Sequence, residues 1–293
     1  MDGENALAVR FEAERPRLRS VAYRMLGSLS EADDAVQESW LRLGRVEPGE
    51  VRNLAAWLTT VVARVCLNVL RSRERHPEEP LGVHLPDPLI GAPDGDPEGA
   101  ALLADAVGLA LMVVLETLEP GERVAFVLHD MFAVPFDVIA PLVERSPAAA
   151  RQLASRARRR VRDGAPVPDP DRARQRAAVD AFFAATRDGD LEALLAVLAP
   201  DVVLRSDNGA ARGGRAVVLR GAEEVAGQAV MFRALAEAAR PALVNGAAGV
   251  VVAHRGRPLS VMAFTVTGGR IAAIDVLADP ARLPDVTAAF LAS

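Results

Sequence analysis

The feature that most constrains this chain is the segment 145–162, which holds seven arginines and no acidic residue although the whole chain has a formal net charge of −5. Wound as a helix at about 100° per residue, the segment separates apolar from polar side chains. The apolar side comprises Ala150, Leu153, Ala157 and Val161. The polar side comprises Arg151, Gln152, Ser155, Arg159 and Arg162, with Arg156 and Arg158 at its flanks. Ser146 is a suitable N-cap, and Pro147 suits the first helical position because its missing N–H costs nothing there.

A shorter helix is predicted immediately before the basic one. Residues 134–143 place Phe136, Ile139, Ala140 and Val143 on one side, and a tight connection at 144–146 follows. Two short helices, a tight turn and a basic outer face on the second helix predict a helix-turn-helix, which binds DNA through that second helix. The alternative is a solvated helix on an ordinary bundle, although surface helices usually interleave both signs of charge.

Length and composition limit the class of protein. A chain of 293 residues predicts two or three domains, and 51% hydrophobic residues exclude global disorder. The charged N-terminus resembles no secretory signal, and the longest apolar run, 106–115, is far shorter than the roughly 18 residues that span a bilayer. We therefore expect a soluble cytoplasmic protein with no membrane contact. Since the sequence pI is about 5.5, any nucleic acid must be bound by local basic patches.

Residues 1–76 predict a first helical domain. A first helix is expected at 7–26. A second helix begins at Ser30, where the sequence resembles a capping box, and a third is expected at 54–75. The second helix directs Ala32, Val36, Trp40 and Leu43 inward, and its outer face comprises Asp34, Gln37, Glu38 and Leu41. The third helix carries a second basic stripe at helical spacing, which comprises Arg64, Asn68, Arg71 and Arg75. A solvated helix face is the alternative for this stripe. Cys66, the only cysteine, excludes disulfides within the chain and is expected to be a buried, inert thiol.

The middle of the chain predicts a linker and a second helical domain. Residues 77–101 contain six prolines and favour an extended, semi-rigid tether. His76 and His84 lie in or beside this stretch without cysteines or clustered carboxylates, so we expect no metal site and no cofactor. The second helical domain, 102–163, has expected helices at 102–118 and 122–131 before the helix-turn-helix, and a hinge at 164–172 follows.

The last segment, 173–293, combines helical patterns with strand patterns, unlike the segments before it, and predicts an α+β domain. Helices are expected at 173–187, 191–198 and 222–239, and strands at 202–205, 215–219, 249–254, 259–266 and 270–277. Gly268 and Gly269 are typical of a two-residue hairpin turn. Helices followed by strands predict a curved antiparallel sheet. Because the strands are apolar on both sides, both sheet faces are covered or one of them lines an apolar cavity.

Two blocks of the helical half resemble a known family. Residues 31–42 and 53–75 resemble region 2 of extracytoplasmic-function RNA polymerase sigma factors, and residues 135–140 with 146–158 resemble region 4. The last domain resembles a SnoaL-like member of the NTF2-like cone fold, which a subgroup of these sigma factors carries. The resemblance implies a multidomain fold: two all-α helical domains, region 2 and the helix-turn-helix region 4, followed by an α+β NTF2-like cone.

Three short segments resemble features of that subgroup. The linker segment is Leu85-Pro86-Asp87-Pro88, and the tail segment is Asp279-Pro280-Ala281-Arg282-Leu283. The turn Asp207-Asn208-Gly209 loosely resembles a glycine-rich turn of the subgroup. The resemblance implies an interdomain regulatory role for Leu85, Pro86, Asp87, Pro88, Asp279, Pro280, Arg282 and Leu283.

The resemblance also implies an initiation subunit that binds core RNA polymerase and promoter DNA. The polymerase would bind the face formed by Asp34, Gln37, Glu38 and Leu41. The loop 46–53 and the third helix would engage the melted minus-ten element through Asn53, Trp57, Arg64, Asn68 and Arg71. Within the minus-thirty-five set, which includes Arg156, base edges would be read by Arg151, Gln152 and Ser155. Phosphates would be bound by Arg158, Arg159 and Arg162.

The last domain leaves other functions open, because NTF2-like domains include small-molecule enzymes as well as binding shells. Its candidate acid–base groups are Asp201, Asp207, His254 and Asp275. No pair among them has clear catalytic spacing, so we expect no enzymatic activity and assign no catalytic residue. Two alternatives remain: an NTF2-like enzyme with a DNA-binding arm, and a one-component regulator whose last domain senses a small ligand in the cone.

Overall fold

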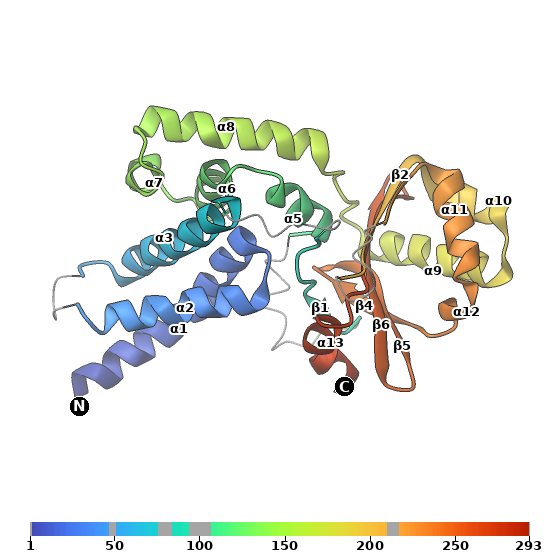
Figure 1. Ribbon diagram of the computed structural model, residues 1–293, viewed down its shortest axis with the longest axis horizontal. Coiled ribbons are helices and arrows are strands. Elements are labelled where there is room, and N and C mark those ends of the chain that lie inside the picture. Colours follow the sequence, from blue (N-terminus) through green and yellow to red (C-terminus); the bar gives the residue numbers. More distant parts are fainter. Residues whose placement is uncertain (1, 47–50, 76–83, 94–106, 210–216, 293) are drawn as a thin grey trace. The chain divides into compact units, whose positions relative to one another are not determined.

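The computed structural model describes residues 2–46, 51–75, 84–93, 107–209 and 217–292, which form two compact units (Figure 1). One unit comprises residues 1–78 and 114–164, and its described part is helical. The other unit comprises residues 79–113 and 165–293 and combines helices with one sheet. Residues 47–50 of the predicted loop and 77–83 and 94–101 of the predicted linker lie outside the described residues.

The helical unit begins with three long helices, α1 (Asp2–Leu26), α2 (Leu29–Leu43) and α3 (Leu54–Arg75). The bounds predicted for α3 are confirmed. The predicted cap of α2 is wrong: Ser28 caps the helix, its Oγ accepting from the Glu31 N–H at 3.4 Å, and Ser30 lies inside the helix. The first helix begins earlier than the predicted residue 7, because its start was placed from an apolar period that residues 2–5 lack.

The long apolar helix α3 is a core element of this unit. By length and composition alone it could cross a membrane. Its buried side chains, which include Leu58, Val62 and Leu67, instead pack in a unit with α1 and α2. Cys66 is buried as predicted, and burial raises the pKa of its thiol to about 12. The thiol therefore stays protonated at neutral pH, and the thiolate is the reactive form.

Five shorter elements follow in the chain, the first of which crosses the boundary between the two units at residue 114. They are α5 (Leu109–Glu116), α6 (Pro120–Phe126), the π-helical segment η1 (Val127–Met131), α7 (Phe136–Leu142) and α8 (Pro147–Gly164). Residues 102–106 of the helix predicted at 102–118 lie outside the described residues, and α5 begins only after Gly108. The helix predicted at 122–131 starts earlier, because Pro120 occupies the first helical position, and it changes to a π-helix at Val127.

The helix-turn-helix is confirmed as α7, a tight turn and α8. Ser146 caps α8 as predicted, and its Oγ accepts from the Ala149 N–H at 3.3 Å. All four apolar residues predicted to share a face at α7, which are Phe136, Ile139, Ala140 and Val143, are buried. Glu144 in the turn has a φ of 55°, which lets the chain reverse between the two helices.

The second unit surrounds a seven-stranded sheet of order β1-β4-β5-β6-β7-β2-β3. Its strands are β1 (Ile90–Gly91), β2 (Leu198–Asp207), β3 (Val217–Arg220), β4 (Ala239–Val244), β5 (Ala247–His254), β6 (Arg257–Thr267) and β7 (Arg270–Leu277). Its helices are α9 (Arg172–Asp188), α10 (Leu191–Val197), α11 (Ala222–Met231), α12 (Arg233–Ala236) and α13 (Leu283–Ala292). Helices and a sheet in this arrangement match the α+β cone that the resemblance implies.

Three predictions for this unit are wrong. The sheet is not wholly antiparallel, because β2 pairs with β7 in parallel. The helix predicted at 222–239 is two helices, α11 and α12, the second of which ends at Ala236, and residues 239–244 form β4. The described part of the predicted tether, 84–93, is not a free linker: Ile90 and Gly91 form an edge strand that pairs with β4. The final helix α13 was not predicted.

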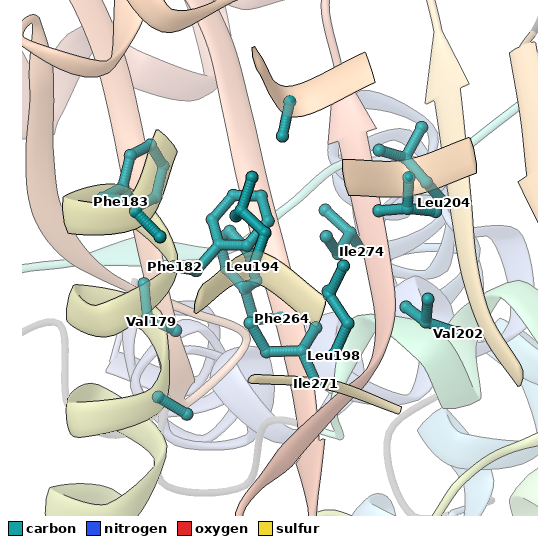
Figure 2. Packing of buried hydrophobic residues seen from close by; sticks show 14 of the residues in the cluster. Val179, Phe182, Phe183, Leu194, Leu198, Val202, Leu204, Phe264, Ile271 and Ile274 are labelled. Atoms are coloured by element: carbon teal, nitrogen blue, oxygen red, sulfur yellow. The ribbon is translucent and has the colours of Figure 1, made fainter. Parts of the chain in front are cut away.

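One face of the sheet packs against helices in a dense hydrophobic core. Phe182 and Phe183 of α9 meet Phe264 of β6, with ring centroids 5.5–6.0 Å apart in edge-on geometry. Figure 2 shows how Leu194 and Ile274 converge on the same cluster from α10 and β7. Side chains therefore fill the region around these rings. At this place the sheet face is covered, which is one of the two alternatives that the sequence predicted; the other was an apolar cavity.

Replacing the central ring of this core should destabilise the second unit. We expect Phe264→Ala to lower the free energy of unfolding by about 3–5 kcal/mol, because it removes apolar contacts and leaves a cavity. Denaturant titration of the full chain followed by circular dichroism measures this change. Phe232→Ala is the control, since Phe232 is 52% exposed, and it should change stability by less than about 0.5 kcal/mol. Equal effects of the two substitutions would contradict this account of the core.

Candidate nucleic-acid interface

The helix α8 presents the two-sided surface that its sequence predicts. Ala150, Ala154 and Ala157 are fully buried. Leu153 and Val161 are only half-buried, so the buried side is narrower and smaller than expected. Four polar residues, Arg151, Gln152, Arg159 and Arg162, are exposed, and Ser155 is half-buried. The guanidinium of Arg151 lies over the Phe136 ring, 5.3 Å from its centroid.

The arginines at the flanks of α8 have partners inside the protein. Arg156 Nε donates to Glu122 Oε1 at 2.7 Å, and Arg160 Nη1 lies 3.1 Å from Glu122 Oε2. Arg158 Nε donates to Asp130 Oδ1 at 2.5 Å. Among the described residues, no ion pair engages Arg159 or Arg162. The arginines of this helix are therefore divided between those that pair with a carboxylate of the protein and those that do not, although Arg156 and Arg160 are themselves exposed.

The basic stripe on α3 lies at the surface of the helical unit. Arg64 and Asn68 are exposed. Arg71 donates through Nη1 to Glu144 Oε1 at 2.8 Å, and this hydrogen bond lowers the pKa of the Glu144 carboxyl. Arg75 donates from Nε to the Arg71 carbonyl at 3.1 Å. Arg64 is thus available to a phosphate without breaking a contact, Arg75 can use its remaining guanidinium nitrogens, and Arg71 would have to exchange partners.

The start of α3 has two further predicted site residues. Asn53 is exposed and accepts from the Ala56 N–H through Oδ1 at 3.1 Å, so its side chain caps the helix. Trp57 is half-buried. Since a capping side chain is already engaged, Asn53 can meet a nucleic acid only through its remaining amide group.

The outer face of α2 is acidic and open. Asp34, Gln37 and Leu41 are exposed, with Leu41 50% accessible. Glu38 is half-buried and pairs with Arg42 one turn later, at 2.8 Å. An exposed leucine among acidic groups is a face that can bind a basic partner by complementary charge and a small apolar contact.

The second unit brings together the three short segments that the resemblance singled out. Leu85, Pro86, Asp87 and Pro88 are all buried against this unit. Arg282 joins them to the tail: its guanidinium donates to Asp87 Oδ1 at 2.5 and 3.0 Å and to the Leu85 carbonyl at 2.7 Å. It also donates to Asp207 Oδ2 at 2.8 Å. One arginine therefore holds segments that are far apart in the sequence.

The turn at Asp207 fits this network closely. Asp207 is 5% exposed and accepts from the Leu85 N–H at 3.0 Å and from the Gly209 N–H at 3.1 Å. Gly209 has a φ of +67°, and a Cβ there would lie 2.3 Å from the Asp279 carboxyl carbon. A side chain at this position would therefore displace Asp279, whose Oδ1 caps the start of the tail segment at Ala281. Leu283 is buried, and Pro280 is half-buried.

The candidate acid–base groups are either engaged or exposed. Asp275 is 1% exposed and accepts from Arg205 Nη1 at 2.9 Å. Burial raises the pKa of its carboxyl, and Arg205 opposes that rise. Asp207 is bound to Arg282 as described above, and Asp201 and His254 are exposed. These contacts account for the two buried carboxylates as members of ion pairs.

Some residues that organise these surfaces were not predicted. Glu122 and Asp130 precede their arginine partners by 34 and 28 positions, and no periodic pattern links them. Asn245 binds the linker: its Oδ1 accepts from the Leu89 N–H at 2.9 Å, and its own N–H donates to the Leu89 carbonyl at 2.7 Å. The Asn245-Gly246 pair, with φ values of 49° and 76°, is a hairpin signal that could have revealed β4.

Comparisons with known proteins agree with the two-part helical region. The family described as Sigma-70 region 2 matches residues 10–76, and Sigma-70 region 4 matches residues 108–161. The ECF RNA polymerase sigma factor SigJ of Mycobacterium tuberculosis is 39% identical, over 92% of this chain and 91% of its own. SigI of the same organism is 34% identical over 98% of both chains.

A solved structure shows this similarity at the level of the fold over most of the chain. The crystal structure of Mycobacterium tuberculosis SigJ covers 94% of this chain and 97% of its own, with a TM-score of 0.77. The chain thus belongs to the extracytoplasmic-function family of RNA polymerase sigma factors, and its role is in transcription initiation. Region 2 corresponds to α1–α3, and region 4 ends with the helix-turn-helix α7–α8.

Removing Arg282 should destabilise the second unit, because two largely buried carboxylates would lose their partner. We expect Arg282→Ala to lower its free energy of unfolding by about 3–5 kcal/mol, the usual consequence of breaking a buried ion pair. Arg282→Lys should restore only part of this loss, since an ammonium cannot match the guanidinium fork. The measurement is denaturant titration of the full chain, with the exposed Arg257→Ala as control. A cost below about 1 kcal/mol, as for a surface pair, would contradict this account.

Proposed function

We propose that this sigma factor binds core RNA polymerase through the outer face of α2 and binds promoter DNA through α3 and α8. The observation that carries the proposal is the outward row of Gln152, Arg159 and Arg162 on a capped recognition helix, in a chain of net charge −5. A guanidinium fork suits phosphates and guanine edges because it donates two parallel hydrogen bonds. The protein works in the cytoplasm, where the polymerase and the template are found, and it needs no enzymatic activity of its own.

Different parts of the recognition helix α8 bind different parts of the DNA. Arg151, Gln152 and Ser155 lie near its N-terminal end, which in helix-turn-helix proteins approaches base edges. Arg159 and Arg162, further along, bind phosphates, which fix register and orientation without reading sequence. The position of the Arg151 guanidinium over the Phe136 ring supports its assignment to bases, since this contact restricts where the guanidinium can lie.

The minus-ten element is assigned to α3 and the loop before it. Arg64, Asn68 and Arg71 supply hydrogen-bond donors along one face, and Asn53 and Trp57 lie at the start of the helix. A half-exposed aromatic ring beside a row of donors suits an unpaired strand, because bases stack on aromatic side chains.

The second unit is assigned a regulatory role in cis. Its contact with Leu85, Pro86, Asp87 and Pro88 supports this role, since these residues belong to the segment that joins the two DNA-binding regions in sequence. Arg282 makes this contact from the tail segment, in which the Asp279 carbonyl accepts from the Arg282 and Leu283 N–H groups. We assign Asp279, Pro280 and Leu283 to the same regulatory segment. A conformational preference of the second unit would thus act directly on that connecting segment.

Association with core polymerase is the test that separates a sigma factor from a one-component regulator. We expect the full chain to bind purified core polymerase and to direct run-off transcription. Leu41→Glu should weaken this binding about tenfold or more, because it replaces the exposed leucine with a further acid. Val138→Glu is the control, since Val138 is 39% exposed on a helix outside α2. Failure of the unsubstituted chain to bind polymerase would refute the proposal.

Base reading by α8 has its own test. We expect Arg151→Ala combined with Gln152→Ala to reduce discrimination at the upstream promoter element by about 1–3 kcal/mol per contacted base pair, because the direct hydrogen bonds are lost. The measurement is binding-site selection from a randomised duplex with the assembled holoenzyme. Arg187→Ala, an exposed arginine of α9, should leave the preference unchanged. An unchanged preference in the double variant would reject the role of these residues.

A further inference from the structure

A buried carboxylate lies beneath the recognition helix. The Glu122 side chain is 4% exposed, although glutamate is almost never buried unless it is paired. It stands in the first turn of α6, where the helix dipole favours a negative charge. The neighbouring Arg123 makes its ion pair with a different carboxylate, because its Nη2 lies 4.0 Å from Glu116 Oε1. The cations at Glu122 are Arg156 and Arg160, both from α8.

The two arginines reach Glu122 from one side of α8. Positions 156 and 160 are one turn apart and differ by about 40° around the helix axis. Arg158 leaves the helix on the opposite flank, where its Nε meets Asp130 of η1 at 2.5 Å. The outward face, with Gln152, Arg159 and Arg162, lies between these two flanks. Carboxylates from two preceding elements therefore hold the helix on both sides.

The apolar side of α8 alone fixes its rotation poorly. Its fully buried residues are alanines, which allow close approach but interlock little with their neighbours. Gly121 of α6 faces this side of α8, and a Cβ there would lie 3.6 Å from Leu153, in ordinary van der Waals contact. Glu122 is buried while the side chains of Arg156 and Arg160 are 51% and 49% exposed, so its ion pairs add a directional constraint at this contact.

We propose that Glu122 is a positioning residue for promoter recognition, which fixes the rotation of α8 by holding Arg156 and Arg160. The inference rests on the proposed function of α8 as the DNA-reading helix. It divides the arginines of this helix into two classes. Arg156 and Arg160 are internal braces, with Arg158 as a weaker brace on the other flank, and Arg159 and Arg162 bind phosphates. Base readout depends on rotation, because contact residues must be held within about 10–20° of their working geometry.

A comparison of arginines tests this division with the full chain assembled on core polymerase. For each variant, the affinity for a duplex selected by the unsubstituted holoenzyme is measured at several salt concentrations. Each phosphate contact contributes about 0.9 to the slope of log affinity against log salt. Arg159→Gln and Arg162→Gln should each reduce the slope by about that amount. Arg156→Gln and Arg160→Gln should leave the slope nearly unchanged, since these arginines contact Glu122 and not DNA.

A second experiment uses Glu122→Gln, which keeps the shape and removes the charge. Arg156 and Arg160, released from Glu122, can then reach phosphates. The slope of log affinity against log salt should therefore steepen by up to about 1.8, the contribution of two phosphate contacts. The ratio of affinities for the selected duplex and a random-sequence duplex should fall about tenfold. Adding Arg156→Gln and Arg160→Gln to this variant should return the slope to its original value. Glu119→Gln, an exposed neighbour on the same turn, is the matched control and should change neither quantity.

The outcomes separate this inference from the proposed function. If Arg156→Gln reduces the slope as much as Arg159→Gln, or if Glu122→Gln leaves the slope and the affinity ratio unchanged, the positioning role is overturned and α8 remains a DNA-binding helix. If none of the four arginine variants changes binding, the proposed function of α8 fails as well. Should Glu122→Gln prevent folding, as judged by thermal unfolding, the arginine comparison still decides, because those variants leave Glu122 in place.

Discussion

Each unit contains largely buried carboxylates that are paired with arginines. In the helical unit Glu122 binds Arg156 and Arg160, and in the second unit Arg282 binds Asp87 and Asp207. The chain contains no lysine, so each of its 34 basic side chains is an arginine. A guanidinium stays charged at any physiological pH and donates in a planar fork, so it can serve two carboxylates or a carboxylate and a carbonyl at once.

The same chemistry that stabilises these units also binds DNA, and this makes the two uses hard to separate. A guanidinium recognises a carboxylate and a phosphate by the same parallel hydrogen bonds. Along α8 the decision is made by what lies nearby: Arg156 and Arg160 face a buried glutamate, whereas no carboxylate of the described residues pairs with Arg159 or Arg162. Carboxylates of the protein and phosphates of DNA therefore compete for the same arginines, and each carboxylate that pairs with an arginine lowers the number of cations available to a template. An acidic protein can in this way present a basic surface of limited size.

The elements that could be predicted from the sequence are those whose ends are marked by local capping or helix-starting residues. The bounds of α3 were confirmed, and α8 begins where Ser146 and Pro147 predict. Elements stabilised by distant partners were missed or misassigned. Strand β4 was not predicted, because the helix expected at 222–239 overlaps it only at Ala239 and the strand is stabilised by pairing with β1 and β5. The parallel pairing of β2 with β7 joins strands that are far apart in sequence, so no local signal specifies it.

The candidate sites show the same limit. Helical periodicity placed Asp34, Gln37 and Leu41 at the surface correctly, because exposure follows from the period and the buried face. It placed Arg156 and Arg158 at the flanks of α8 but gave no sign of Glu122 or Asp130, whose positions depend on how α6 and η1 pack. Resemblance singled out Asp87 and Arg282, and the structure shows why both are needed: each would be a largely buried charge without the other.

The contact between residues 84–93 and the second unit is stronger than a surface docking. It combines strand pairing by β1, the hydrogen bonds of Asn245 to Leu89, and the buried charges of Asp87, Asp207 and Arg282. Exposed ion pairs such as Arg71–Glu144 contribute about 0–1 kcal/mol, whereas breaking a buried pair costs about 3–5 kcal/mol. These residues are therefore an integral part of the second unit. Moving the segment out of the second unit would expose three charges at once.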